Sequence, residues 1–474
     1  MVFSSETFLF LFLPFFLLIY WLVPARARLY FILFGSLIFY GWWDPKYLML
    51  LLFVIVTTYY FGIWAAEKRH GLRYLAIGVS LNLLVLIVFK YANFLRDNIN
   101  WAADPLYCAV VGEPCGQTLR FEDIILPIGI SFFIFQGISY VIDMYRGDAT
   151  RARNIFEFAA FMSFFPQLIA GPVLRYKDLA DQFKAIVPNL PAVRDGAVRF
   201  WIGFCKKVLV ADTVAVLSDT LFFNPDPTFA EAWLALLAYS VQLYFDFSGY
   251  SDMAIGLGMM VGFRFPENFC HPYLSHSITE FWRRWHISLS TWLRDYLYIP
   301  LGGSRGAARM TYRNLLLTMV LGGIWHGAGW AFFVWGLWHG TFLAVERLCK
   351  AAFNFHLLIP QWVSRLYLLV IVMWGWAFFN AGSVGIGVDG ALSLISATLN
   401  PFNFALRPEV WANLPTLALL TLGFGLVYTQ IGEQSIARLQ ARSHALFWSF
   451  LALFLLAVLK LNLDAESPFL YFQF

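Results

Sequence analysis

The sequence predicts an all-α protein that crosses a membrane many times. Of its 474 residues, 60% are hydrophobic and only 13% are charged, whereas soluble domains carry about 25% charged residues. Apolar runs recur along the whole chain, and a helix needs about 20 apolar residues to cross a bilayer. The net charge of +4 is modest, and Lys and Arg gather in short loops. This pattern is typical of membrane topology and does not indicate binding to nucleic acid.

The apolar runs follow one another with short polar links. The first, 8–23, is preceded by Glu6 and followed by Arg26 and Arg28, an order that predicts an uncleaved span with its N-terminus outside. Neither an internal repeat nor a long linker is evident, so we expect a single domain over 1–474. The other predicted segments are 29–43, 46–65, 74–93, 124–143, 155–173, 196–222, 229–262, 314–326, 330–348, 363–380, 414–431 and 444–462.

The charges of the links predict the topology. The links 24–28, 67–73 and 146–153 are basic and should be cytoplasmic, while the mixed loop 96–123 should lie outside. The tail 462–474 lacks Lys and Arg and is also expected outside. Two runs, 155–173 and 196–222, are interrupted by Pro, Gly or charge, which favours re-entrant or interfacial helices.

The chain has five cysteines, and their spacing does not match a metal site. Cys108 and Cys115 share the predicted outer loop without a nearby His to complete a zinc site. In an oxidising compartment they can pair as a disulfide. Two free thiols fit the sequence equally well.

Segment 278–297 has apolar residues at helical spacing, with Arg283, Arg284 and Arg294 on the opposite side. Such a basic amphipathic helix is expected to lie in the membrane interface. His286 falls at the edge of the apolar stripe, where it can point toward a cavity. Arg305 and Arg309 follow the helix and extend a basic, cytoplasmic surface. We expect this surface to attract an anionic, phosphate-bearing donor; membrane topology and contact with lipid headgroups are the competing explanation.

His326 lies in the stretch Leu321-Gly-Gly-Ile-Trp-His-Gly-Ala-Gly-Trp, beside Trp325. Ionisable residues at membrane depth are costly, so they indicate function by default. The small residues leave room for a ligand, and a neutral imidazole there can act as a general base. A histidine that only packs between helices is an equally good reading. For His339, in a second Trp-His-Gly, a structural role is favoured.

Asp246 and Asp252 lie in the apolar run 229–262. Carboxylates in such a run pair with cations or line a polar cavity, and Arg283 and Arg284 are the candidate partners. A structural ion pair is the favoured interpretation, and the orientation of a catalytic histidine is the alternative. The sequence lacks a P-loop, a dinucleotide-binding glycine motif and a Gly-x-Ser-x-Gly motif, which disfavours ATP-driven transport and a serine hydrolase.

Several motifs together carry a family resemblance. The sequence resembles the membrane-bound O-acyltransferase (MBOAT) family, and within it the bacterial polysaccharide O-acetyltransferases of the alginate type. The resemblance covers the chain to about residue 348 and its tail, whereas 350–460 matches in hydropathy alone. The motifs are Lys90-Tyr-Ala-Asn-Phe, Leu126-Pro-Ile-Gly-Ile-Ser-Phe, Ala170-Gly-Pro-Val-Leu-Arg, Tyr244-Phe-Asp-Phe-Ser-Gly-Tyr-Ser-Asp-Met, Phe281–Leu297, Gly322–Gly327 and the final Ser467-Pro-Phe-Leu-Tyr-Phe-Gln-Phe.

The resemblance implies a helical shell of about 11 to 13 membrane segments around a central tunnel. It implies that His326 is the catalytic histidine and His286 the second of the pair, with Trp285 and Trp325 beside them. The implied donor is a cytoplasmic acyl thioester such as acetyl-CoA, used as a substrate without a bound cofactor. The implied acceptor side holds periplasmic partner proteins and an exported polysaccharide, in a bacterial inner membrane with both termini periplasmic.

Two other functions remain open from the sequence. A polysaccharide or ion transporter would use the buried His and Asp as a relay, although no repeat typical of such transporters is evident. A scaffold that only docks soluble enzymes would leave the two buried histidines without a purpose. A His326 and His286 pair facing one polar cavity would favour the transferase.

Overall fold

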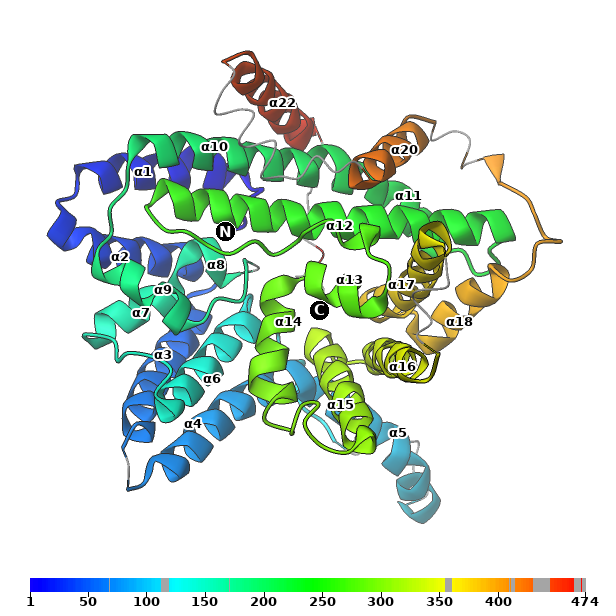
Figure 1. Cartoon of the computed structure of the whole chain (residues 1–474), viewed down its shortest axis with the longest axis horizontal. Helices are drawn as coiled ribbons and strands as arrows, with labels where there is room; N and C mark the ends of the chain where they lie inside the picture. Colours follow the sequence, from blue (N-terminus) through cyan, green and yellow to red (C-terminus); the bar gives the residue numbers. More distant parts are fainter. Residues whose placement is uncertain are drawn as a thin grey trace.

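The computed structural model describes residues 1–67, 69–111, 119–169, 171–353, 360–408, 410, 414–428, 444–463 and 470. All regular elements in these ranges are helical (Figure 1), which confirms the predicted all-α class. The first third contains the π-helical turn η1 (Thr7–Phe12), α1 (Leu13–Leu22), the short η2 (Ala25–Ala27), α2 (Arg28–Gly41), α3 (Pro45–Ala65), α4 (Gly71–Leu86), the π-helical turn η3 (Ile87–Tyr91), α5 (Ala92–Val111) and α6 (Ile130–Arg146).

The two runs interrupted by Pro, Gly or charge differ in the structure. The run 155–173 forms two short helices, whereas 196–222 stays helical throughout and contains a π-helical turn. That either run is re-entrant or interfacial stays a prediction. The elements of this part of the chain are α7 (Ile155–Ser163), α8 (Phe165–Leu168), α9 (Tyr176–Lys184), α10 (Leu190–Cys205), η4 (Lys206–Ala211), α11 (Asp212–Phe222) and the long α12 (Phe229–Met260).

The predicted amphipathic helix over 278–297 is wrong in one respect, because the chain breaks at its centre. Trp285 is extended and His286 has a left-handed backbone with φ of 42°. Three short pieces replace the single helix, so the apolar stripe does not run continuously along one face. They are α13 (Ile278–Arg284), α14 (Ile287–Leu293) and the π-helical turn η6 (Arg294–Tyr298), preceded by η5 (Pro272–Leu274).

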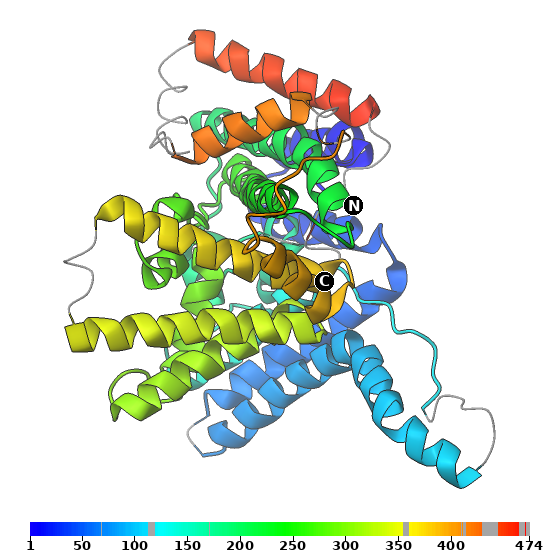
Figure 2. The ribbon, with the colours of Figure 1, turned by 90° about the vertical axis from the view of Figure 1, so that its right-hand side faces the viewer.

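The remaining elements follow η6 in the chain. They are α15 (Ala308–His326), α16 (Trp330–Phe353), α17 (Gln361–Ser383), α18 (Gly387–Ala397), α20 (Leu414–Tyr428) and α22 (His444–Leu463). Figure 2 shows α16 and α17 lengthwise, whereas Figure 1 shows α12 lengthwise and α16 nearly end-on. The long helix α12 therefore runs across the direction of α16 and α17.

Four helical stretches in the described residues are long and apolar enough to span a membrane: Pro45–Ala65, Gly71–Asp104, Gln361–Ser383 and His444–Leu463. Their lipid-facing character is visible in the small buried share of two of them, 22% for Gly71–Asp104 and 17% for His444–Leu463. Together they identify a membrane protein, while the total number of crossings stays a prediction.

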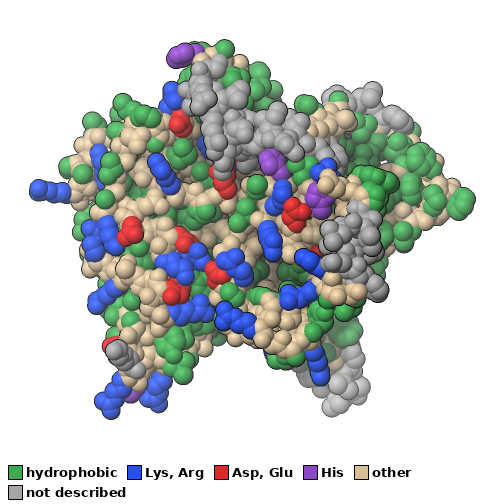
Figure 3. Space-filling view, in the orientation of Figure 1, with side chains coloured by type: hydrophobic (Ala, Val, Ile, Leu, Met, Phe, Trp, Pro, Cys, Tyr) green, Lys and Arg blue, Asp and Glu red, His purple; other side chains and the backbone are tan. Residues whose placement is uncertain are grey.

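Basic side chains are spread over one face of the molecule (Figure 3). In Figure 2 this face lies on the left, where α3 ends and α4 begins and where α16 ends and α17 begins. The far end of α5 lies on the opposite side. The predicted outer loop 96–123 is wrong at its start, because residues 96–111 belong to α5. The far end of α5 and the predicted cytoplasmic link 67–73 lie on opposite sides of the molecule.

Candidate active site

His326 is the last residue of α15, and its side chain is only 6% exposed. The helix stops there because Gly327 is extended. Three aromatic rings surround the imidazole: Trp325 at 4.9 Å, Trp335 at 5.0 Å and Phe379 at 5.1 Å between ring centroids. The last turn of α15 thus places the histidine inside an apolar, largely water-free enclosure.

The carbonyl groups of this last turn are held from another helix. Lys90, buried in η3, donates from Nζ to the carbonyl oxygens of Trp325 at 2.6 Å and His326 at 2.9 Å, and to Ser131 Oγ at 3.3 Å. The adjacent Tyr91 donates its hydroxyl to the carbonyl oxygen of Ile324 at 2.7 Å. Sequence reasoning assigned Lys90 no role beyond its motif. The signal that could have found it is a lysine inside the apolar run 74–93.

His286 is fixed by Asn268. The imidazole Nδ1 lies 3.2 Å from Asn268 Oδ1, which also accepts hydrogen bonds from the Ser288 hydroxyl at 2.8 Å and the Ser288 N–H at 3.2 Å. Phe247 of α12 packs edge-on against the ring at 4.6 Å. The side chain is 1% exposed. Asn268 was not singled out from the sequence, because it lies in a loop without a recognisable motif.

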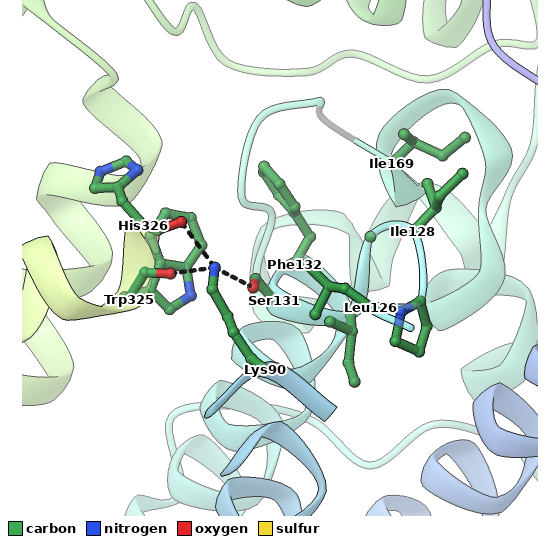
Figure 4. Close-up of a pocket in the computed structure, with 11 residues that line it drawn as sticks. Lys90, Leu126, Ile128, Ser131, Phe132, Ile169, Trp325 and His326 are labelled. Carbon is green, nitrogen blue, oxygen red and sulfur yellow. Dashed lines mark hydrogen bonds between the residues drawn. The ribbon is translucent and has the colours of Figure 1, made fainter. Parts of the chain in front are cut away.

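The fold brings the two histidines into the same region, since they are close enough to interact electrostatically. A small cavity of about 40 Å³ touches His326 (Figure 4) but is not lined by His286, so the described residues do not show the predicted single cavity facing both histidines. Its walls come from η3, the start of α6, the segment after α8 and the end of α15. The lining residues are Lys90, Leu126, Pro127, Ile128, Gly129, Ile130, Ser131, Phe132, Ile169, Trp325 and His326.

His339 lies on α16 and is fully buried. The ring of Trp335 contacts both His326, at 5.0 Å, and His339, at 5.1 Å between ring centroids. Both ring nitrogens of His339 lack a hydrogen-bond partner among the described residues. A buried polar group without a partner is unusual in native proteins, so a purely structural role explains His339 incompletely.

The two predicted tryptophans pack among other aromatic rings. Trp285 stacks on Phe281 at 5.6 Å and lies 4.9 Å from Trp376. Trp325 stacks on Phe135 at 4.9 Å. Of the two, Trp325 contacts His326 directly.

The predicted partners of Asp246 and Asp252 were wrong. Asp252 pairs with Arg199 and with Lys206, whose Nζ lies 2.7 Å from Oδ2, and Asp246 pairs with Lys207 at 2.7 Å. All three cations belong to α10 and η4, because these elements pack along α12, whereas Arg283 and Arg284 lie on α13. The favoured interpretation as structural ion pairs agrees with this geometry, although the pairs anchor α10 to α12 and not the amphipathic segment.

The predicted basic surface divides into separate parts. Arg284 pairs with Glu280 at 2.7 Å, and Arg294 pairs with Asp295 at 2.7 Å. Arg305 and Arg309 are exposed on the link before α15 and on its first turn. Of these arginines, Arg283 lines a pocket of about 630 Å³ between α13 and α16 that also contains Arg347 and Lys350. Neither Arg347 nor Lys350 was predicted.

The predicted pairing of Cys108 with Cys115 lies outside the described residues, because the side chain of Cys108 and all of Cys115 fall there. It stays a prediction.

Comparison with known proteins agrees with this architecture. The family model of the membrane-bound O-acyltransferases matches residues 147–386, a range that contains both histidines. The chain belongs to the membrane-bound O-acyltransferase family. It is therefore an O-acyltransferase, and the transporter and scaffold alternatives are set aside.

Similar MBOAT proteins cover the whole chain. A probable alginate O-acetylase of Azotobacter vinelandii is 46% identical over 100% of both chains, and one of Pseudomonas aeruginosa is 45% identical, also over 100% of both. A peptidoglycan O-acetyltransferase of Helicobacter pylori is 37% identical over 80% of this chain and 77% of its own. This MBOAT protein is thus similar throughout its length to proteins named as probable alginate O-acetylases, and over four fifths of its length to one named as a peptidoglycan O-acetyltransferase.

Proposed function

We propose that this O-acyltransferase transfers an acetyl group from a cytoplasmic thioester, such as acetyl-CoA, across the bacterial inner membrane for O-acetylation of an exported polysaccharide such as alginate. The observation that carries the proposal is the full-length identity of 45–47% to probable alginate O-acetylases, combined with a buried histidine pair. Periplasmic partner proteins complete the transfer to the polymer, and the chain acts as a single domain.

In this mechanism His326 is the general base. Its burial among aromatic rings keeps the imidazole neutral, because a charged ring would lose hydration. A neutral imidazole removes the proton of the acceptor hydroxyl as the oxygen attacks the thioester carbonyl carbon. The C–S bond then breaks, the thiol leaves with a proton returned from His326, and the acyl group remains on the acceptor oxygen.

His286 orients the acceptor. Asn268 Oδ1 faces Nδ1 of His286 and already accepts two bonds from Ser288, so it acts as an acceptor toward the ring as well. The proton therefore resides on Nδ1, which leaves the lone pair on Nε2. A lone pair on Nε2 can accept a hydrogen bond from a hydroxyl, and Asn268 fixes the direction of that bond.

The donor binds at the basic pocket between α13 and α16. Glu346 is engaged by the backbone N–H groups of Ile278 at 2.6 Å and Thr279 at 3.2 Å. Glu280 is paired with Arg284. Because both carboxylates are occupied, Arg283, Arg347 and Lys350 give the pocket a positive surface, and no salt bridge is made by these three cations within the described ranges. Guanidinium groups bind phosphate bidentately, which suits a phosphate-bearing thioester.

The basic face of Figure 3 is then cytoplasmic, by the positive-inside rule. The far end of α5 is periplasmic, as it lies on the other side (Figure 2). Both termini are assigned to the periplasm from the charge pattern of the first span and of the tail.

The test is complementation of an alginate-producing bacterium that lacks its own membrane acetylase. The wild-type chain should restore O-acetyl groups, measured by NMR of the polymer. His326→Gln should abolish acetylation at normal membrane yield, and His286→Gln should reduce it by about 100-fold. The exposed His70 offers a matched control, since His70→Gln changes the same chemistry away from the site. Full acetylation by His326→Gln would contradict the proposal, and unmodified polymer with the wild-type chain would contradict the assigned acceptor.

A further inference from the structure

The backbone carbonyl groups at the C-terminal end of α15 need hydrogen-bond donors that the helix itself does not supply. The last four carbonyl groups of a helix have no partner within the helix. Where such groups are buried away from water, other parts of the protein must satisfy them. The carbonyls of Ile324, Trp325 and His326 are in the last turn of α15, where Trp325 and His326 are buried, and His326 is the proposed base.

Two consecutive residues of η3 satisfy all three carbonyls. Tyr91 holds Ile324, while Lys90 holds Trp325 and His326 at once. A cation at a helix C-terminus is favoured by the helix dipole, and bonds from an ionised donor are stronger than neutral ones. With Ser131 as third partner, the three ammonium protons of Lys90 are all used.

Figure 4 shows how this contact bears on the histidine. The carbonyl oxygen of His326 faces Lys90, and the imidazole points away from it. Lys90 therefore does not reach the place where the ring would meet substrate, and it acts through the backbone of the residue it holds. The backbone carbonyl and the ring share one Cα, so fixing the first restricts the second.

We propose that Lys90 is a positioning residue of the acyl transfer, whose ammonium fixes the last turn of α15 and thereby the His326 imidazole. The inference rests on the proposed role of His326 as the base. Displacement of a reacting group by about 1 Å can cost about 100-fold in rate. Loss of the ammonium should accordingly lower turnover while leaving donor binding, which occurs at the pocket between α13 and α16, nearly unchanged.

The experiment compares Lys90→Met with Tyr91→Phe in proteoliposomes, with acetyl-CoA as donor. Lys90→Met should lower kcat by about 10- to 100-fold and change KM for the donor by less than about 2-fold. Tyr91→Phe removes a neutral bond to the same turn and should cost about 5-fold or less. Lys90→Arg, which keeps the charge, should recover part of the lost kcat.

A second measurement is independent of activity. Hydrogen–deuterium exchange of the peptide 318–330 should be faster in Lys90→Met than in wild type, since the turn loses two of its three anchors. If Lys90→Met does not fold, Lys90→Gln, which keeps a neutral donor, replaces it. The loss of kcat and the increase in exchange rate should then have the same direction but be smaller. Unchanged exchange, unchanged kcat, or equal losses in Lys90→Met and Tyr91→Phe would overturn the inference.

Failure of the proposed function is distinguishable from failure of this inference. An active His326→Gln would show that His326 is not the base, whatever Lys90 does. In that case the exchange rates alone decide whether Lys90 holds the turn: faster exchange in Lys90→Met supports the anchor, and wild-type exchange removes it.

Discussion

His286 illustrates how single residues are held in unusual states at this site. Its φ of 42° is in the left-handed region, which costs a non-glycine residue energy and persists only when the surroundings fix it. Asn268 supplies that fixation through three contacts, one to the ring and two to Ser288, and its amide nitrogen donates to Ser251 at 3.1 Å. Ser288 in turn accepts from the N–H of Val173. One buried asparagine thus joins the loop after α12 to α14.

We predict that Asn268→Leu lowers turnover by about 10- to 100-fold, because the His286 ring loses the partner that fixes its tautomer and direction. Asn268→Asp keeps an oxygen acceptor and should retain more activity than Asn268→Leu. Polymer acetylation and the melting temperature in detergent are measured together. Equal activity of Asn268→Leu and wild type at normal yield would show that His286 does not need this partner.

Among the elements, the turn η6 is fixed by a charged cluster outside the four candidate spans. Asp295 accepts from Arg175 at 2.7 Å and from Arg294 at 2.7 Å, and Arg175 also pairs with Asp178 of α9. Burial by itself would raise the pKa of Asp295, but the hydrogen bonds and positive charge of Arg294 and Arg175 outweigh it, so the pKa lies below its usual range. The cluster connects the segment that carries His286 to α9.

This depressed pKa gives a pH-dependent prediction. A carboxylate whose pKa is lower in the folded state contributes stability above its unfolded pKa of about 4, and that contribution is lost as the pH falls through the folded value. Asp295→Asn should therefore lower stability by about 0.5–1 kcal/mol at pH 7, given its partial exposure. The difference from wild type should shrink as the pH is lowered below about 4. Thermal unfolding in detergent at several pH values measures this, and a pH-independent difference would contradict it.

For the whole molecule, the fold places the basic pocket and the ion pairs of the long helix α12 in different groups of helices. The positive pocket of Arg283, Arg347 and Lys350 opens between α13 and α16, and the ion pairs of Asp246 and Asp252 bind α10 and η4 to α12. In Figure 1 α12 lies across the molecule next to α10, with α13 and α16 on its other side. The histidines lie where these groups of helices meet.

We predict that the double variant Arg283→Gln/Arg347→Gln raises KM for acetyl-CoA by about 10-fold, with a larger effect at low salt, because exposed charges are screened within about 10 Å at 0.1 M ionic strength. Arg305→Gln/Arg309→Gln removes two exposed arginines that do not line the pocket and serves as the matched control. A larger rise of KM in Arg305→Gln/Arg309→Gln than in Arg283→Gln/Arg347→Gln would show that the donor binds near Arg305 and Arg309, which belong to the basic surface predicted from the sequence.

The sequence alone determined the all-α membrane class and the family, because these depend on composition, on the length of apolar runs and on local motifs. The role of the two histidines, drawn from the same motifs, stays a prediction. The sequence also marked 155–173 and 196–222 as interrupted runs, and the first of these is divided into two short helices while the second stays helical through a π-helical turn. The left-handed break at His286 was missed because a helical period continues through it in sequence, while the contacts with Asn268 that support the break come from another segment.

Only the tertiary structure decided which residues meet. Asp246 and Asp252 could be recognised as buried charges, yet their partners came from α10 and η4 and not from α13. Lys90 and His326 are far apart in the chain, and nothing local links a lysine in one apolar run to the last turn of another helix. Pairing of buried charges and of helix ends depends on which helices pack side by side, and that is a property of the folded chain as a whole.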